Sequence, residues 1–209
     1  GLKSPLMKRK MNLHKIIKYF IILKLIFLIF LMASCSSDYV PKPRGFFRID
    51  LPEKKYRLFD TAYPFTFEYP EYARIIPDTI KTAEPYWLNL EFPSFNGQVN
   101  ISYKSINNNL AQYAEDAYNL AMKHIPKADD IDPQRIDFGE HNVHGITYNI
   151  TGNEAASAYQ FFVTDSVSNF VRGALYFNVS PNNDSLAPVI TFLKEDISHM
   201  IETLQWKKI

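Results

Sequence analysis

Apolar and polar residues alternate along several short stretches in the middle of the chain, which is the pattern of β-strands with one buried face. In residues 65–69 every second residue is aromatic. Further short strands are expected at 72–76, 87–92 and 99–103. The turn between the last two contains Asn96-Gly97, the strongest short hairpin signal. The pattern therefore predicts four strands, the last two joined as a hairpin.

The period of the apolar positions then changes from two to about 3.6, which is typical of an amphipathic helix. We expect one helix over 110–124, capped by Asn109, and a second over 186–204, capped by Asp184 or Ser185. Four strands are expected between these helices, at 136–140, 143–151, 158–164 and 170–178. The order ββββ-α-ββββ-α predicts an α+β fold, with an antiparallel sheet of about 6–8 strands packed by two helices.

The N-terminal part carries a basic segment and then an apolar stretch that ends near the only cysteine of the chain. Ala33 and Ser34, both small, stand directly before Cys35, and no acidic residue precedes it. This arrangement resembles a bacterial lipoprotein signal. We therefore expect residues 1–34 to be a signal peptide with a signal helix, and Cys35 to carry a lipid. An uncleaved membrane anchor over 16–32 and a buried helix stay open as alternatives.

Removing the leader changes the charge of the protein. Seven of the 23 Lys and Arg residues precede Cys35, whereas all 22 Asp and Glu residues follow it. The remaining chain has sixteen basic residues against 22 acidic ones, a formal charge of −6, although the whole sequence reads +1. Nucleic-acid binding needs a basic surface, so we expect no nucleic-acid partner. The remaining length suits one domain, and we expect a single α+β domain at 63–209.

Residues 35–62 are expected to form a Pro-rich tether, because prolines keep such a segment extended. The segment also holds aromatic and basic residues that a plain spacer does not need. We therefore expect part of it to dock on the domain or on a partner, since aromatic and arginine residues dominate interface energetics. A solvated, membrane-proximal tether is the other interpretation. The candidate docking residues are Arg44, Phe46, Phe47, Arg48, Lys54 and Lys55.

The stretch from Pro41 to Tyr56, PKPRGFFRIDLPEKKY, resembles the signature of the GldD family of gliding-motility lipoproteins of Bacteroidetes. The agreement continues through Phe92-Pro93 and the ending Leu204-Gln205-Trp206-Lys207. The resemblance implies a non-enzymatic component of the gliding and type IX secretion machinery, without catalytic residues or a small-molecule substrate. It implies an outer-membrane protein on the periplasmic face, anchored by a covalent lipid (palmitate) on Cys35 and working with other envelope lipoproteins.

The element order is also similar to that of the photosystem subunit PsbP and the import factor Mog1, which implies a PsbP/Mog1-like sandwich. Fold alone does not determine function. An alternative function is therefore a periplasmic ligand- or metal-binding carrier on a lipid anchor.

The histidines His141 and His144 are the weak candidates for a metal site, with Glu140 as a third ligand. On a regular strand their side chains point to opposite faces, so only a turn brings them together. Ordinary turn and strand-end histidines are the simpler interpretation, and we expect neither a metal nor another cofactor. The sequence also lacks a G-x-S-x-G elbow and a phosphate-binding glycine motif, so it gives no support to an enzyme.

Overall fold

The computed structural model describes residues 13–32 and 49–207. The chain divides into two units, residues 1–45 and 46–209, which are described separately. The first unit contains α1 (Leu13–Met32), at the place of the expected signal helix. In the described part of the chain, none of the helices combines the length and apolar character needed to cross a membrane. Cys35, the predicted lipid site, lies outside the described residues.

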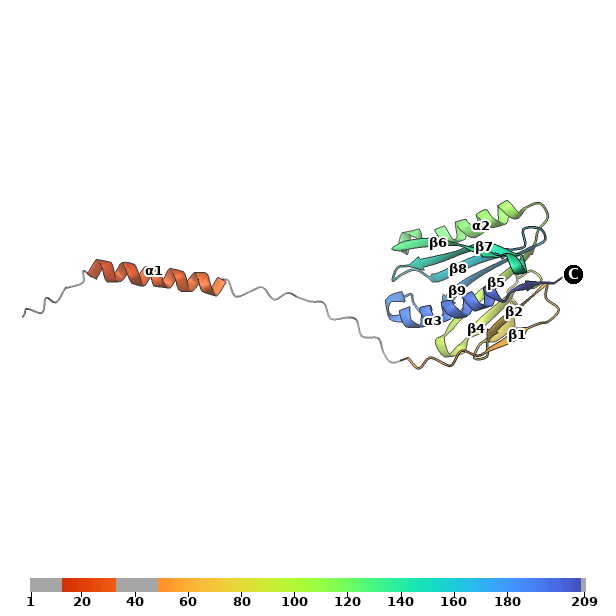
Figure 1. Cartoon of the computed structure of the whole chain (residues 1–209), viewed down its shortest axis with the longest axis horizontal. Helices are drawn as coiled ribbons and strands as arrows, with labels where there is room; N and C mark the ends of the chain where they lie inside the picture. Colours follow the sequence, from red (N-terminus) through yellow and green to blue (C-terminus); the bar gives the residue numbers. More distant parts are fainter. Residues whose placement is uncertain (1–12, 33–48, 208–209) are drawn as a thin grey trace, which may run out of the picture. The chain divides into compact units, whose positions relative to one another are not determined.

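The second unit is an α+β domain built on two antiparallel sheets (Figure 1). The larger sheet has the strand order β3-β4-β5-β9-β8-β7-β6, and the smaller one has the order β1-β2-β10. The strands are β1 (Tyr56–Phe59), β2 (Phe65–Pro70), β3 (Arg74–Pro77), β4 (Leu88–Phe92), β5 (Gly97–Ser105), β6 (Asp130–Phe138), β7 (Val143–Thr151), β8 (Ser157–Thr164), β9 (Asn169–Phe177) and β10 (Gln205–Trp206). The predicted fold class is thus confirmed, with a second, smaller sheet added.

Two helices cover the two faces of the larger sheet (Figure 1). Helix α2 (Leu110–Met122) packs on β8 and β9, and the small cluster beneath it includes Ala117, Ala121 and Phe162. Helix α3 (Asn183–Glu202) and the smaller sheet cover the other face. The larger of the two hydrophobic cores lies between this face, α3 and the smaller sheet. Apolar burial on both faces of the sheet is the main stabilising contribution.

The main core is rich in aromatic side chains from the smaller sheet. Phe65 and Phe67 are fully buried, and their ring centroids are 5.9 Å apart. Phe59 of β1 stacks on Phe67 at 5.0 Å. Alternate residues of β2 point into this core, which confirms the alternation read from residues 65–69.

The predicted hairpin joins β4 and β5, with Phe92 paired to Gly97. Its turn is a short 3-10 helix, η1 (Pro93–Phe95), and Asn96 then adopts the left-handed conformation with φ 49°. Asparagine tolerates this conformation better than most residues. The β6–β7 connection has the same turn geometry, with the 3-10 helix η3 (Gly139–His141) followed by Asn142 at φ 51°.

Several boundaries differ from those expected. The second helix begins at Asn183, three residues earlier than predicted, because the side chain of Asn182, not Asp184 or Ser185, accepts a hydrogen bond from the Ser185 N–H. Asn109 stands at the start of α2, but its side chain accepts from the Asn107 N–H instead of a helix N–H. Both helices end two residues before the predicted ends.

The edges of the larger sheet are β3 and β6. Strand β6 begins at Asp130, six residues before the predicted start, and runs through Pro133. A proline is compatible with an edge strand because one side of that strand has no hydrogen-bonding partner. The other edge, β3, has four residues and ends at Pro77.

The folded unit also includes residues that were expected to belong to the tether. Strand β1 pairs with β2 over its whole length, from Tyr56 opposite Pro70 to Phe59 opposite Phe67. The folded domain therefore begins before the expected start at Tyr63 and contains at least the end of the segment 35–62.

A partly buried polar relay connects the turn after α2 to the sheet. Arg172 Nη2 donates to Gln160 Oε1 at 2.6 Å, and Gln160 Nε2 lies 2.8 Å from His124 Nε2. Because arginine is only a donor, the amide of Gln160 must donate to His124, whose Nε2 is then unprotonated. Burial, together with the charge of Arg172, lowers the pKa of His124 below its ordinary value.

This relay predicts a pH dependence of stability. As pH falls from about 7 to about 5, the unfolded chain takes up a proton on His124 before the folded chain does, so the free energy of unfolding should fall. A His124→Gln variant should show a weaker fall over this range, measured by urea denaturation at several pH values. Ile125→Gln, at the exposed neighbouring position, is the control and should keep the wild-type slope. An unchanged slope in His124→Gln would refute this assignment.

Candidate functional site

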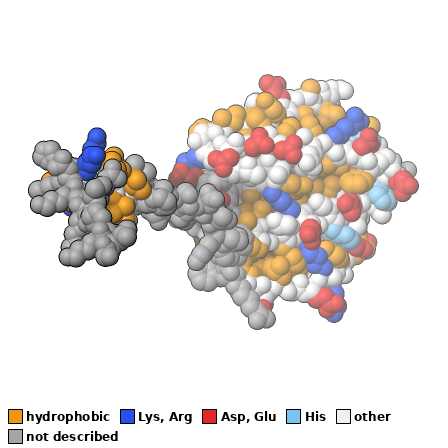
Figure 2. Space-filling view, turned by 60° about the vertical axis from the view of Figure 1, so that its left-hand side comes forward, with side chains coloured by type: hydrophobic (Ala, Val, Ile, Leu, Met, Phe, Trp, Pro, Cys, Tyr) orange, Lys and Arg blue, Asp and Glu red, His pale blue; other side chains and the backbone are white. Residues whose placement is uncertain are grey.

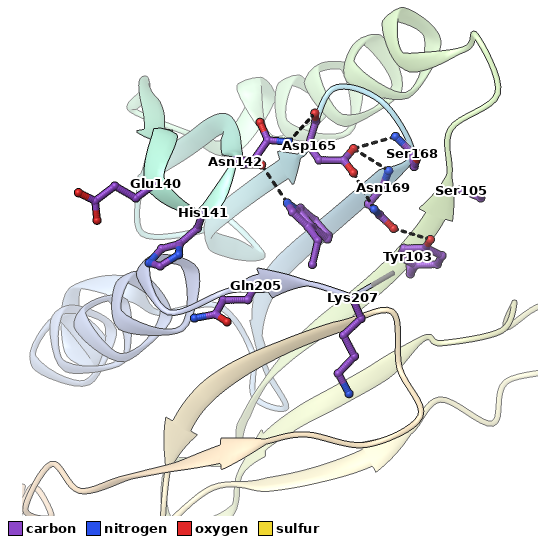
Figure 3. A pocket seen from close by; sticks show the side chains of 11 residues that line it. Tyr103, Ser105, Glu140, His141, Asn142, Asp165, Ser168, Asn169, Gln205 and Lys207 are labelled. Atoms are coloured by element: carbon purple, nitrogen blue, oxygen red, sulfur yellow. Dashed lines mark hydrogen bonds between the residues drawn. The ribbon is translucent and has the colours of Figure 1, made fainter. Parts of the chain in front are cut away.

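A polar pocket of about 780 Å³ lies where loops of the larger sheet meet the C-terminal strand (Figure 3). Volumes of about 300–1,000 Å³ are usual for ligand sites. Its walls come from the end of β5, from η3, from the β8–β9 turn and from β10. The lining residues are Tyr103, Ser105, Glu140, His141, Asn142, Asp165, Ser168, Asn169, Gln205, Trp206 and Lys207.

The β8–β9 turn is organised by Asp165. Its Oδ1 accepts hydrogen bonds from the N–H groups of Val167, Ser168 and Asn169 at 2.8–2.9 Å. Its Oδ2 accepts from Asn169 Nδ2 at 2.7 Å, and Asn169 Oδ1 in turn accepts from the Tyr103 hydroxyl at 2.8 Å. Burial raises the pKa of Asp165, but these hydrogen bonds outweigh it and hold the pKa below its ordinary value.

The C-terminal strand is tied to the same region. Trp206 Nε1 donates to the Asn142 carbonyl at 2.9 Å, and Asn142 Nδ2 donates to the Asp165 carbonyl at 3.3 Å. Lys207 Nζ is held by Asp60 Oδ1 and by the Thr61 carbonyl. These hydrogen bonds join four segments that are far apart in sequence, near residues 60, 142, 165 and 206. The pocket is therefore preformed.

A second arrangement fixes the segment that precedes β1. The Asp196 carboxylate, on α3, is only 1 % exposed. It accepts hydrogen bonds from Lys54 Nζ at 3.1 Å, from the Tyr56 hydroxyl at 2.7 Å and from the Tyr72 hydroxyl. Lys54 Nζ also donates to the Phe192 carbonyl at 2.9 Å and lies 4.2 Å above the centre of the Phe192 ring. We name this cluster the Asp196 anchor.

The anchor changes the acidity of both tyrosines. Burial is the largest cause, and the hydrogen bonds to Asp196 and its negative charge act in the same direction, raising the pKa of Tyr56 and of Tyr72. Both hydroxyls therefore stay protonated, and remain donors to the carboxylate, even in alkaline solution where an ordinary tyrosine would ionise.

The sequence matches the family model described as gliding motility lipoprotein GldD over residues 36–206. The chain belongs to the GldD family. This confirms the resemblance read from the segment Pro41–Tyr56, and it makes the protein a gliding-motility lipoprotein of the cell envelope. No curated protein matches the chain.

A solved structure similar to this GldD-family chain is the solution structure of cyanobacterial PsbP (CyanoP) from Synechocystis sp. PCC 6803. It shares 11% sequence identity, with a TM-score of 0.45, and the alignment covers 83% of this chain and 99% of that one.

The structure places two of the six predicted docking residues of this GldD-family protein. Lys54 contacts α3 of the same chain through the Asp196 anchor. It therefore docks on the domain, which is one of the two alternatives, domain or partner, that the sequence left open. Lys55 is exposed and lies 2.8 Å from Glu53. Arg44, Phe46, Phe47 and Arg48 lie outside the described residues.

The two histidines considered as metal ligands have different surroundings. His141 lines the pocket. His144 Nδ1 lies 3.0 Å from Asp137 Oδ1, and its Nε2 lies 3.2 Å from Asn142 Oδ1. Within residues 13–32 and 49–207, no group of three or more His, Cys, Asp or Glu side chains is placed to hold a metal ion. The metal alternative gains no geometric support from these residues.

Sequence reasoning missed Asp196. The apolar stripe of the second helix includes Leu193 and Met200, and Asp196 lies three residues after the first and four before the second. That spacing puts a carboxylate on the buried face of the helix. A buried charge needs a partner, so an acidic residue on the apolar face of the predicted helix was the signal that could have revealed this cluster.

Proposed function

We propose that this GldD-family protein is a non-enzymatic outer-membrane lipoprotein that serves as a structural or assembly component of the gliding-motility and type IX secretion machinery. A covalent lipid, palmitate among its acyl chains, attaches to Cys35 after cleavage of residues 1–34. The domain works on the periplasmic face of the membrane. Its partners are other envelope lipoproteins of the same machinery.

The observation that supports this proposal most is the Asp196 anchor. It fixes the chain to the domain at Lys54, nineteen residues after Cys35. An extended chain of that length spans at most about 65 Å. A domain anchored in this way stays close to the membrane that holds its lipid, as a scaffold component requires.

Four of the predicted docking residues lie six to ten positions before Lys54 of the anchor. Arg44, Phe46, Phe47 and Arg48 combine two aromatic side chains with two guanidinium groups within five positions. Tryptophan, tyrosine and arginine are the residues most enriched at interface hot spots, and phenylalanine is also enriched at interfaces. We propose that this short segment is the partner-binding element, presented between lipid and domain.

The face of the domain drawn in Figure 2 gives no support to nucleic-acid binding. On the face in Figure 2, the basic side chains are scattered among acidic and hydrophobic ones and form no basic patch. Binding to a polyanion relies on a clustered basic surface. The formal charge of −6 after Cys35 acts in the same direction.

Crosslinking in living cells, followed by mass spectrometry, tests the proposal. The wild-type protein should crosslink to envelope lipoproteins, and a Phe46→Ala/Arg48→Ala variant should lose most of these crosslinks while keeping its membrane location. A Cys35→Ser variant should lose its acyl label and leave the membrane fraction.

The matched control is Tyr118→Ala/Lys123→Ala, which removes an exposed aromatic residue of α2 and an exposed cation at its C-terminal cap. It should crosslink like the wild type. Recovery of no envelope protein above background from wild-type cells would refute the assembly role. Unchanged crosslinks in the Phe46/Arg48 variant would refute the docking segment alone.

A further inference from the structure

Part of the hydrogen-bonding capacity of the polar pocket is unused. The side chains of Ser105, Ser168, His141 and Gln205 line it, and none of them has a hydrogen-bond partner among the described residues. His141 and Gln205 lie on one side of the pocket and Tyr103 on the other (Figure 3). Together the four side chains without a partner offer hydroxyl, imidazole and amide groups, each of which can both donate and accept hydrogen bonds.

The charged groups of the pocket are largely satisfied from within the protein. Lys207 is paired with Asp60, and both oxygens of Asp165 already accept hydrogen bonds. Glu140, which is exposed, is the remaining charge among the lining residues. An anionic ligand would therefore have to compete with Asp60 for Lys207, and a metal ion would meet a single free carboxylate. A ligand that suits this pocket is neutral.

The pocket also has an aromatic surface. Trp206 is half-buried, and its indole nitrogen is held by the Asn142 carbonyl, which fixes the ring in place. A flat aromatic face packs well against C–H groups, while hydroxyl groups of the same ligand reach the surrounding polar side chains. An entirely apolar ligand would leave those polar groups desolvated and unpaired, at a cost in affinity.

We propose that this pocket binds a neutral saccharide. Sugar rings combine an apolar C–H face with hydroxyl groups that both donate and accept, which matches a fixed indole among Ser168, Gln205 and His141. The walls are already joined through Trp206–Asn142–Asp165–Asn169, so little ordering is needed on binding. This inference concerns the pocket alone and does not depend on the lipid or on the docking segment.

Binding of tetrasaccharides to the purified full-length protein in detergent tests the proposal. The two probes are a tetramer of N-acetylglucosamine and a tetramer of glucose, which separate an acetamido-sugar glycan from a plain hexose polysaccharide. Saturation-transfer NMR and calorimetry should detect binding of at least one of them. A Ser168→Ala/Gln205→Ala variant should bind it about tenfold more weakly, as expected for two lost hydrogen bonds.

The matched control is Ser94→Ala/Gln134→Ala, in which the same residue types are removed from exposed positions in η1 and β6, outside the pocket. It should bind like the wild type, and all variants should keep the wild-type melting temperature. Binding of neither tetramer at millimolar concentration would overturn the proposal. Equal weakening by the pocket and control variants would overturn it as well.

Discussion

Replacing Asp196 by alanine should lower the free energy of unfolding by about 3 kcal/mol. The carboxylate is the common acceptor for Lys54, Tyr56 and Tyr72, and its removal leaves an ammonium and two tyrosine hydroxyls facing a buried space without that acceptor. Removing one partner of a buried ion pair is costly because the other stays desolvated. The segment before β1 should also detach from α3 and become sensitive to limited proteolysis.

Urea denaturation of the purified protein, followed by tryptophan fluorescence, measures this change. Glu195→Ala is the matched control: Glu195 is the neighbouring acid on α3, lies 2.8 Å from the same lysine, and has a side chain that is 63% exposed. An exposed ion pair contributes little, so its removal should cost less than about 1 kcal/mol. Equal losses in the two variants would show that the buried carboxylate has no special role.

Gly145→Ala should destabilise the domain by a similar amount, about 3 kcal/mol, because overpacking against backbone cannot be relieved by a rotamer change. Gly145 lies in β7, and a Cβ atom there would stand 1.9 Å from the Phe162 carbonyl oxygen of β8. The two strands would have to separate or shift, which disturbs the pairing of β7 and β8 in the larger sheet.

Gly139→Ala is the comparison for this variant, since a Cβ at Gly139 meets no atom within 4 Å. Thermal and urea unfolding of the two variants side by side separates the steric effect from the general effect of replacing a glycine. A Gly145→Ala protein as stable as Gly139→Ala would mean that the close approach of β7 and β8 relaxes freely.

Local patterns were enough to predict most of the domain. The aromatic alternation at 65–69 gave β2, Asn96-Gly97 gave the β4–β5 hairpin, and the change of period after residue 109 gave α2. Each of these signals lies within a few residues and expresses which side of an element is buried. The second helix was also found from its apolar stripe, with only its ends displaced.

Features that depend on distant contacts were not predictable in this way. Strand β1 has four residues in a charged, proline-containing context, and it is a strand because β2 lies beside it. The two residues of β10 likewise form a strand because they pair with β2. The pocket combines residues near 103, 140, 165 and 206, so no local window contains it. His141 was noted only as a metal candidate, and Trp206 only as part of the family ending.

The two edge strands of the larger sheet have a further consequence at a membrane. A lipoprotein moves on a surface, where neighbouring copies meet at a far higher local concentration than in solution. Exposed strand edges under such crowding promote edge-to-edge association and aggregation. Pro133 and the charges of β6 oppose it on one side, and the shortness of β3 with its terminal Pro77 opposes it on the other. Copies of this protein should therefore not associate through the edges of the larger sheet on a densely populated membrane, and these edges should not hinder contact with other partners.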